Sequence, residues 1–161
     1  MAAKGTPATL AAQRAEIAFT LHEYTAAGDG GDAGYGAEAA AALGVDPARV
    51  FKTLVVELDS GLAVAVAPVT GPLDLKALAA ALGAKRAALA EPGAAERATG
   101  YVVGGISPLG QRRALPMVLD ESALAHPTVF VSAGRRGLEI ALAPADLLRL
   151  TNARAAPLAR R

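Results

Sequence analysis

Cysteine and tryptophan are absent from the sequence, and histidine occurs only as His22 and His126. Without cysteine the chain has no disulfide, no thiolate nucleophile and no cysteine-ligated metal. This composition is compatible with a reducing cytoplasm, which is the location that we expect. Because the two histidines do not have the spacing of a zinc-binding helix, we predict no metal site and no cofactor.

A strong charge of one sign and long apolar runs are also lacking. The chain carries 16 basic and 15 acidic residues, which is a formal net charge of +1. This balance argues against tight, non-specific binding of nucleic acid, which depends on an excess of basic groups. No apolar run reaches the length of a membrane-spanning helix, so we predict no membrane partner. The length favours a single domain over residues 1–161 with its own core.

The hydrophobic pattern predicts helices and strands that intermix without strict βαβ alternation. The uninterrupted apolar run at 62–69 indicates a central strand, buried on both faces. The composition of residues 28–36 is typical of a glycine-rich loop, and we expect the tail to Arg161 to be frayed. These elements favour one α+β domain with a largely antiparallel, barrel-like sheet. Helices are expected at 7–18, 37–43, 73–82, 91–98 and 144–150, and strands at 19–24, 51–58, 62–69, 86–90, 101–103, 116–119, 128–132 and 138–142.

One lysine stands inside an apolar strand. Lys52 follows Val50-Phe51 and precedes Thr53-Leu54. An ammonium group in such a strand either reaches solvent from one face or binds a phosphate or a developing carbonyl charge. The residues alone leave both interpretations open. Thr53 points to the opposite face if the strand is regular.

A glycine-rich loop spans Gly100–Gly110. Gly104 and Gly105 have no Cβ, so main-chain N–H groups can approach a ligand closely, and Ser107 adds a hydroxyl. Such a loop can bind a phosphate or an oxyanion, but an ordinary tight turn explains the same residues. The loop matches neither a P-loop nor a dinucleotide-binding motif, and no serine lies in a hydrolase nucleophile elbow.

Other polar residues give weaker indications. Tyr24, Tyr35 and Tyr101 can stack on a base or bind a substrate, but a place in the core or at its rim is the more common role of such tyrosines. The arginine pairs 112–113 and 135–136 can contact phosphates or stand solvated in loops.

Five stretches together resemble the YbaK/EbsC family of free-standing aminoacyl-tRNA editing deacylases, which are related to the insertion domain of bacterial prolyl-tRNA synthetase. The resemblance runs in order from about residue 14 to 158, and the run Thr99–Gln111 is specific to it. That run is most similar to the branch that acts on Cys-tRNA(Pro). The stretches are Val50–Leu54, Ala65–Val69, Leu73–Lys76, Thr99–Gln111 and Ser132–Ile140.

The resemblance implies a function and partners. A member of this branch removes cysteine from Cys-tRNA(Pro), with Cys-tRNA(Cys) as a further substrate, in a transient complex with prolyl-tRNA synthetase. The substrate's own thiol attacks the ester carbonyl and releases the tRNA and a cyclic thioester, so no protein nucleophile is needed. An Ala-tRNA(Pro) editing deacylase and a non-catalytic module that binds a synthetase or tRNA remain as alternatives.

The resemblance also implies site residues. Lys52 matches the family's key lysine, which orients the aminoacyl ester or the phosphate of the terminal adenosine. Gly104 and Gly105 match the loop that walls the pocket and offers main-chain donors. Glu139 stands where an aspartate is common, and the glycine-rich stretch before Tyr35 departs from the family pattern. The implied substrate-binding residues are Tyr24, Tyr35, Thr53, Ile106, Ser107, Ser132 and Glu139.

Overall fold

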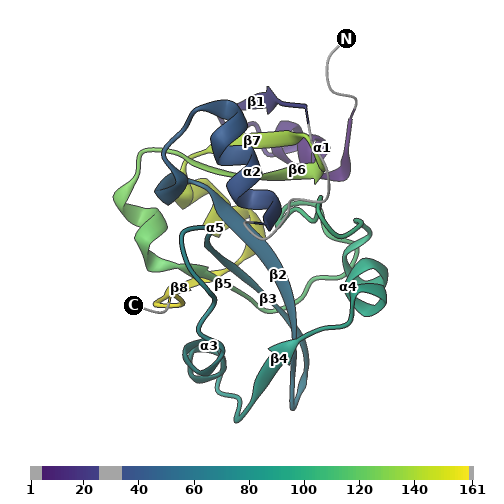
Figure 1. Ribbon diagram of the computed structural model, residues 1–161. Coiled ribbons are helices and arrows are strands. Elements are labelled where there is room, and N and C mark those ends of the chain that lie inside the picture. The colour runs from purple at the N-terminus through teal and green to yellow at the C-terminus, as the bar shows by residue number, and fades with distance from the viewer. Residues whose placement is uncertain (1–4, 26–33, 160–161) are drawn as a thin grey trace.

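Two β-sheets with helices around them make up residues 5–25 and 34–159, which the computed structural model describes, with residues 34–36 described by their backbone alone (Figure 1). The helices are α1 (Pro7–Arg14), α2 (Gly34–Leu43), η1 (Pro47–Arg49), α3 (Leu75–Ala81), α4 (Pro92–Thr99), η2 (Glu121–Ala125) and α5 (Pro144–Thr151), η marking a 3-10 turn. The strands are β1 (Phe19–Glu23), β2 (Phe51–Leu58), β3 (Gly61–Pro68), β4 (Ala87–Leu89), β5 (Met117–Asp120), β6 (Val129–Arg135), β7 (Leu138–Leu142) and β8 (Arg154–Ala156). The predicted α+β class is therefore confirmed.

The strands form two sheets among the described residues. One has the order β4-β2-β3-β5-β8 and the other the order β1-β7-β6. Most pairs are antiparallel, as predicted, but β5 is parallel to both β3 and β8. A single parallel bridge between Val50 and Phe130 links the two sheets. No closed barrel forms among these strands, because β6 leaves β2 after this one bridge and pairs with β7 instead.

Strand β3 is the centre of the larger sheet, as its apolar run predicts. It lies between β2 and β5, and its residues 63–67 are at most 1% exposed. Val64 and Val66 pack into one hydrophobic cluster, while Ala63 and Ala65 pack into another on the opposite face. This double burial makes β2, its hairpin partner, a rigid support for the side chains described below.

Local sequence signals explain where several elements begin and end. Thr6 and Thr9 form a reciprocal capping box before α1, with Pro7 at the first helical position. Asp74 caps α3 by accepting hydrogen bonds from two main-chain N–H groups. Helix α4 ends at Gly100, whose φ of 82° is the left-handed conformation that glycine adopts most readily.

Two predicted elements are wrong. Residues 101–103 do not form a strand, because no strand of the described residues pairs with them and the Glu96 carboxylate accepts the Val103 N–H instead, at 2.9 Å. The C-terminal tail is not frayed through its length. Strand β8 pairs with β5, and Asp120 Oδ1 accepts the Leu158 N–H at 2.6 Å. Leu158 is fully buried, which holds this segment against the core.

The first helix is shorter than predicted. It stops at Arg14 because Glu16 adopts a positive φ of 58°, and the chain then turns into β1. None of the helices in the described ranges is long and apolar enough to cross a membrane.

Candidate active site

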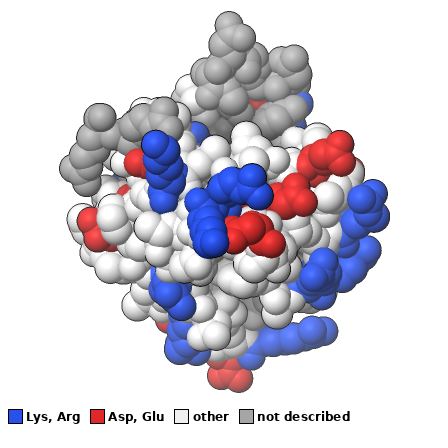
Figure 2. All heavy atoms as spheres, turned by 90° about the horizontal axis from the view of Figure 1, so that it is seen from below, with Lys and Arg blue, Asp and Glu red and all other residues white. Residues whose placement is uncertain are grey.

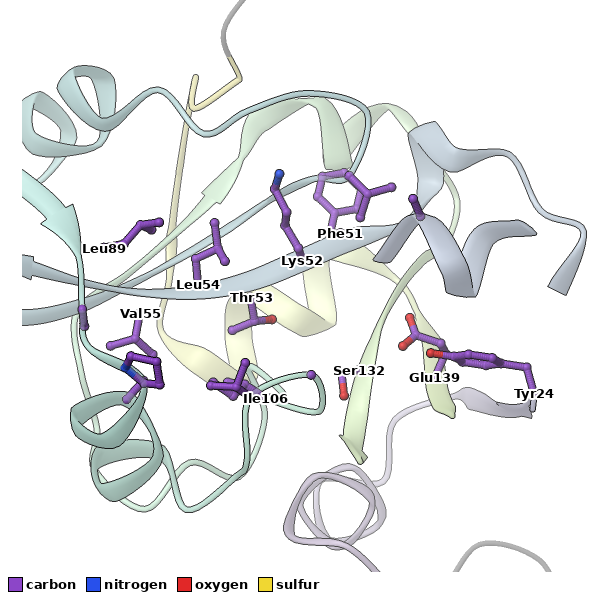
Figure 3. Close-up of a pocket in the computed structure, with 17 residues that line it drawn as sticks. Tyr24, Phe51, Lys52, Thr53, Leu54, Val55, Leu89, Ile106, Ser132 and Glu139 are labelled. Atoms are coloured by element: carbon purple, nitrogen blue, oxygen red, sulfur yellow. The ribbon is translucent and has the colours of Figure 1, made fainter. Parts of the chain in front are cut away.

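A cavity of about 480 Å³ opens beside β2, at the place where the two sheets separate (Figure 3). Its walls come from β2, the β4–α4 junction, the loop after α4, and the facing strands β6 and β7. Seven of the predicted site residues line this cavity. They are Tyr24, Lys52, Thr53, Gly104, Ile106, Ser132 and Glu139.

Lys52 and Thr53 lie on opposite sides of β2, as the strand pattern predicts (Figure 3). The Lys52 ammonium donates a hydrogen bond to the carbonyl oxygen of Gly71 at 2.8 Å. Burial lowers the pKa of Lys52, since a charged ammonium is less well solvated there. The side chain points away from Ile106 and Ser132, so its charge acts at a different part of the cavity from theirs.

Thr53 extends toward the side of β2 where Ile106 and Ser132 lie (Figure 3). Its Oγ1 atom is buried and has no hydrogen-bond partner among the described residues. A buried hydroxyl without a partner costs free energy, on the order of 1–3 kcal/mol, unless a ligand or water supplies the missing bond. The Thr53 hydroxyl is therefore a group that a bound substrate can satisfy.

Glu139 forms part of the wall opposite β2. It is 7% exposed, and burial raises the pKa of its carboxyl to about 8. No cation among the described residues pairs with it in an ion bridge. Ser132 lies opposite Glu139 in the β6–β7 register, and the Ser132 hydroxyl accepts the Gly134 N–H at 3.2 Å. These strands thus present an almost buried, mostly protonated carboxyl to the cavity at neutral pH.

Tyr24 stands beside Glu139 at the same wall (Figure 3). Its main-chain N–H donates to Gly137 at 3.0 Å, which fixes the end of β1 on the β6–β7 hairpin. Burial, followed by the nearby Glu139 carboxyl, raises the pKa of the Tyr24 phenol. The phenol therefore remains protonated at neutral pH and can donate a hydrogen bond to a substrate.

The glycine loop divides into a part that lines the cavity and a part that packs. Gly104 lines the cavity with a positive φ of 96°. Gly105 faces the hairpin instead, where a Cβ would lie 2.7 Å from the Arg135 Cα, and its N–H donates to Val102. Ser107 is fully buried, and its hydroxyl accepts the Leu109 N–H at 3.2 Å. Gly105 and Ser107 therefore hold the loop in place and do not line the cavity.

The remaining tyrosines have different places. The side chain of Tyr35 lies outside the described residues, although its backbone begins α2. Tyr101 is a core residue, and its hydroxyl donates to the Leu109 carbonyl at 2.6 Å. Burial raises the pKa of the Tyr101 phenol to about 12. Tyr101 is therefore a support for the glycine loop.

Arg135 and Arg136 are engaged with carboxylates. Arg135 pairs with the exposed Glu23 at 2.8 Å. Arg136 pairs with Glu38 at 3.0 Å, and both of these side chains are largely buried. Because Glu38 belongs to α2, the second pair ties that helix to the hairpin beside the cavity. Arg135 therefore remains solvated although it is paired, whereas Arg136 is largely shielded from solvent.

Several lining residues were missed by the sequence analysis. Leu54, Leu89, Pro92 and Val103 add an apolar surface to the cavity, and Leu89 and Val103 are also exposed to solvent. The one available signal was the apolar Val102-Val103 pair beside the glycine loop, whose pattern instead predicted a strand. Leu89 gave no signal, since its exposure depends on how β4 ends against β2.

Charged residues do not form one continuous basic surface on the face seen from below (Figure 2). In that view lysine and arginine stand in separate groups, with acidic residues beside several of them. A second depression, between α3 and β4, shows the same mixture, with Lys76, Lys85 and Arg86 near Glu57 and Asp59. This distribution agrees with the small net charge of +1.

Comparison with known proteins identifies the class of this cavity. The family model of the aminoacyl-tRNA editing domain matches residues 33–150. The chain therefore belongs to the aminoacyl-tRNA editing domain family, which confirms the predicted class of aminoacyl-tRNA deacylases.

Individual relatives agree with this family. A protein of Enterococcus faecalis named as a candidate Cys-tRNA(Pro)/Cys-tRNA(Cys) deacylase, EbsC, is 45% identical over 114 residues, which is 70% of each chain. A crystal structure described as a candidate trans-editing enzyme for prolyl-tRNA synthetase is 26% identical with a TM-score of 0.84, covering 99% of this chain and 100% of that one. The structure of a hypothetical protein has a TM-score of 0.84 at 25% identity, covering 96% and 100%. The two structural matches agree with the predicted α+β fold.

Proposed function

We propose that this protein clears cysteine from mischarged Cys-tRNA(Pro), and also from Cys-tRNA(Cys), in the cytoplasm. The observation that carries the proposal is a cavity whose described lining holds a carboxyl and hydroxyl groups but no hydrogen bond between them, in a chain that is 45% identical to a candidate Cys-tRNA deacylase. No histidine lines the cavity, and the Ser132 hydroxyl is oriented by the Gly134 N–H. A reaction that uses a nucleophile from the substrate fits these residues.

The cysteinyl thiol is that nucleophile. Its sulfur forms a bond to the ester carbonyl carbon, and the bond between that carbon and the ribose oxygen breaks. The products are a cyclic thioester and the free ribose hydroxyl of the tRNA. The thiol proton passes to the ionised fraction of Glu139 and from there to the leaving ribose oxygen. A carboxyl with a pKa of about 8 is well matched to a thiol, whose ordinary pKa is about 8.5.

Lys52 serves the nucleic-acid part of the substrate in this proposal. Its ammonium points to the other side of β2 from Ile106 and Ser132, where it is close to Gly71. A compact ammonium group is suited to a phosphate of the tRNA terminus. We therefore assign it the positioning of the terminal adenosine, with Gly104 and Ile106 closing the wall around the amino acid.

A partner supplies the selection of tRNA. The net charge of +1 gives little general attraction for nucleic acid. A structural relative is described as a candidate trans-editing enzyme for prolyl-tRNA synthetase. We propose that prolyl-tRNA synthetase binds this protein transiently and presents the mischarged tRNA to it.

A deacylation assay tests the proposal. Cys-tRNA(Pro), Ala-tRNA(Pro) and Ser-tRNA(Pro) are incubated separately with the protein, and the remaining aminoacyl-tRNA is measured over time. We expect cysteine to be removed fastest, because a hydroxyl is a far weaker nucleophile than a thiol at neutral pH and alanine has no nucleophile. Equal rates on the serine and cysteine substrates would argue against thiol assistance. Preferential removal of alanine would establish the Ala-tRNA(Pro) activity instead, and no turnover on any substrate would favour a binding module.

A further inference from the structure

The edge of β2 is open for the length of one residue beside the cavity. In the β2–β3 hairpin, the Val69 N–H donates to the Val50 carbonyl. Residues alternate along an antiparallel pair, so even-numbered residues of β2 bond to β3 and odd-numbered ones direct their N–H and C=O groups away from it. The Ala90 N–H, which donates to the Val55 carbonyl on the β4 side, confirms this alternation.

Two neighbours cover the ends of this outward edge but not its middle. Strand β6 meets it at the Val50–Phe130 bridge, and β4 pairs with it from Val56 onward. If the β4 register continued, Pro92 would lie opposite Thr53, and proline has no N–H to donate. No strand in the described ranges therefore pairs with Thr53 on this side.

By this pattern the N–H and C=O of Thr53 have no strand partner among the described residues and lie at the edge that borders the cavity. All residues from Phe51 to Val55 line the cavity, so the gap between β4 and β6 opens into it. The unpartnered Oγ1 of the same residue lies there as well. The cavity wall thus offers one main-chain donor, one main-chain acceptor and one hydroxyl, all from one residue.

We infer that the main-chain N–H and C=O of Thr53 bind the carbonyl oxygen and the α-ammonium group of the amino acid carried by the tRNA. An aminoacyl group carries a nitrogen and a carbonyl in the same order as one residue of a strand. In an antiparallel hydrogen-bonded pair, the two residues exchange both main-chain bonds, and a one-residue opening can accept one amino acid in this way. This inference rests on the proposed function, because it takes an aminoacyl ester as the ligand.

The arrangement separates two kinds of recognition. Main-chain bonds at Thr53 hold any α-amino acid equally, since they do not involve its side chain. Ile106 and Ser132, on the side toward which Thr53 points, then contact the side chain and determine which amino acid is accepted. The ester carbonyl, polarised by the Thr53 N–H, becomes a better target for the thiol.

Stable analogues test the inference with the unmodified protein. The probes are 3′-deoxyadenosines that carry at the 3′ position an amide-linked cysteine, or 3-mercaptopropanoate, which lacks only the amino group. We expect the second probe to bind about tenfold more weakly or worse, since a hydrogen bond from a charged donor is lost. Equal affinities of the two probes would overturn the inference. A titration monitored by calorimetry or by competition gives both affinities.

Glu139→Gln determines which group holds the amine. If the Thr53 carbonyl binds it, removal of the amino group weakens the probe by the same factor in the variant as in the unmodified protein. If the penalty disappears in Glu139→Gln, the carboxylate binds the amine and the inference is wrong.

Thr53→Pro and Thr53→Val separate the main chain from the side chain. Proline lacks both the hydroxyl and the outward N–H, so it differs from valine in the missing N–H and its ring; the β2–β3 ladder remains, and the preceding Lys52 is already extended as a residue before proline must be. Valine removes only the hydroxyl. We expect the proline variant to bind the cysteinyl and alanyl probes at least tenfold more weakly than the valine variant, by the same factor for both.

The outcomes distinguish the inference from the proposed function. A folded Thr53→Pro that binds within twofold of Thr53→Val would contradict the inference, and a thermal melt establishes whether it is folded. If Thr53→Pro does not fold, the affinities of the cysteine and 3-mercaptopropanoate probes for the unmodified protein still test the inference. If the protein deacylates Cys-tRNA(Pro) but binds both probes equally, the proposed function is supported and the inference is wrong. If the protein distinguishes the probes but deacylates none of the aminoacyl-tRNAs, the binding mode is supported and the proposed function is wrong.

Discussion

The two sides of β2 differ in chemistry although they are built from adjacent residues. On one side Lys52 presents a cation near the Gly71 carbonyl, at a place where water still has access. On the other side Thr53 faces Ile106 and Ser132, which belong to the same cavity as the almost buried Glu139 carboxyl. One strand thus separates a region suited to a phosphate from a region suited to an amino acid. A substitution on the Lys52 side should slow the reaction of all substrates equally. The effect of a substitution on the Thr53 and Glu139 side should depend on the amino acid or on pH.

Lys52→Ala gives the largest expected effect. We predict a loss in kcat/KM on the order of 100-fold, because an electrostatic contact with the tRNA terminus is removed. The loss should be equal for every aminoacyl-tRNA that the protein accepts, since Lys52 does not point to the amino-acid side. Rates on cysteinyl and alanyl substrates measure this. Lys85→Ala, which removes an exposed lysine outside the cavity, is the matched control and should retain activity. A loss that differs between the two amino acids would place Lys52 on the amino-acid side.

Stability should depend on pH through Glu139. The pKa of its carboxyl is raised from 4.5 to about 8 on folding, so the native state binds more protons than the unfolded state between these values. Stability therefore falls as pH rises through this window. Between pH 6 and pH 8 we predict a decrease of about 2 kcal/mol in the free energy of unfolding. Urea unfolding at the two pH values measures it. The same measurement with Glu139→Gln should show no such decrease, and an unchanged slope in that variant would assign the effect to another group.

Glu139→Gln should also reduce activity, by about tenfold at pH 7. The amide keeps the shape of the side chain but cannot accept the thiol proton. The loss is limited because a few per cent of the thiol ionises without help at this pH. Single-turnover rates on Cys-tRNA(Pro) between pH 6 and pH 9 measure the effect, and the deficit should shrink as pH rises above the thiol pKa. Glu139→Asp restores a carboxylate and should recover part of the rate. A deficit independent of pH would indicate a structural role for Glu139.

Glu96→Ala gives the smallest expected effect. The Glu96 carboxylate accepts the Val103 N–H at 2.9 Å and so holds the loop that carries Gly104. Loss of this partly exposed bond, worth about 1 kcal/mol, should raise KM about threefold with little change in kcat. Glu96→Gln keeps an acceptor oxygen and should stay near the original KM. If both variants behave alike, the bond does not position the loop. Steady-state kinetics on Cys-tRNA(Pro) distinguish these results.

The glycine loop shows where sequence reasoning reached its limit. Gly104 and Gly105 are chemically identical and adjacent, and both were predicted to offer donors to a ligand. The structure separates them, because a Cβ on Gly105 would lie 2.7 Å from the Arg135 Cα, 30 residues further along the chain. A contact between such distant segments has no local signature. Tyr101 is a similar case, since its hydroxyl bonds to a carbonyl across the same loop.

The sequence by itself determined the family, the α+β class, the central β3 and seven of the residues that line the cavity. These depend on local properties, namely apolar patterns, caps and motifs, which neighbouring residues carry. The tertiary structure decided that the described strands form two sheets and not a barrel, that Lys52 and Glu139 lie at different parts of one cavity, and that Thr53 lies at an unpaired edge. The reason is that a stretch of β2 stays unpaired only where the two neighbouring strands leave a gap between them. Here β4 ends before Pro92 and β6 turns away after Phe130, and neither limit has a local signature in β2.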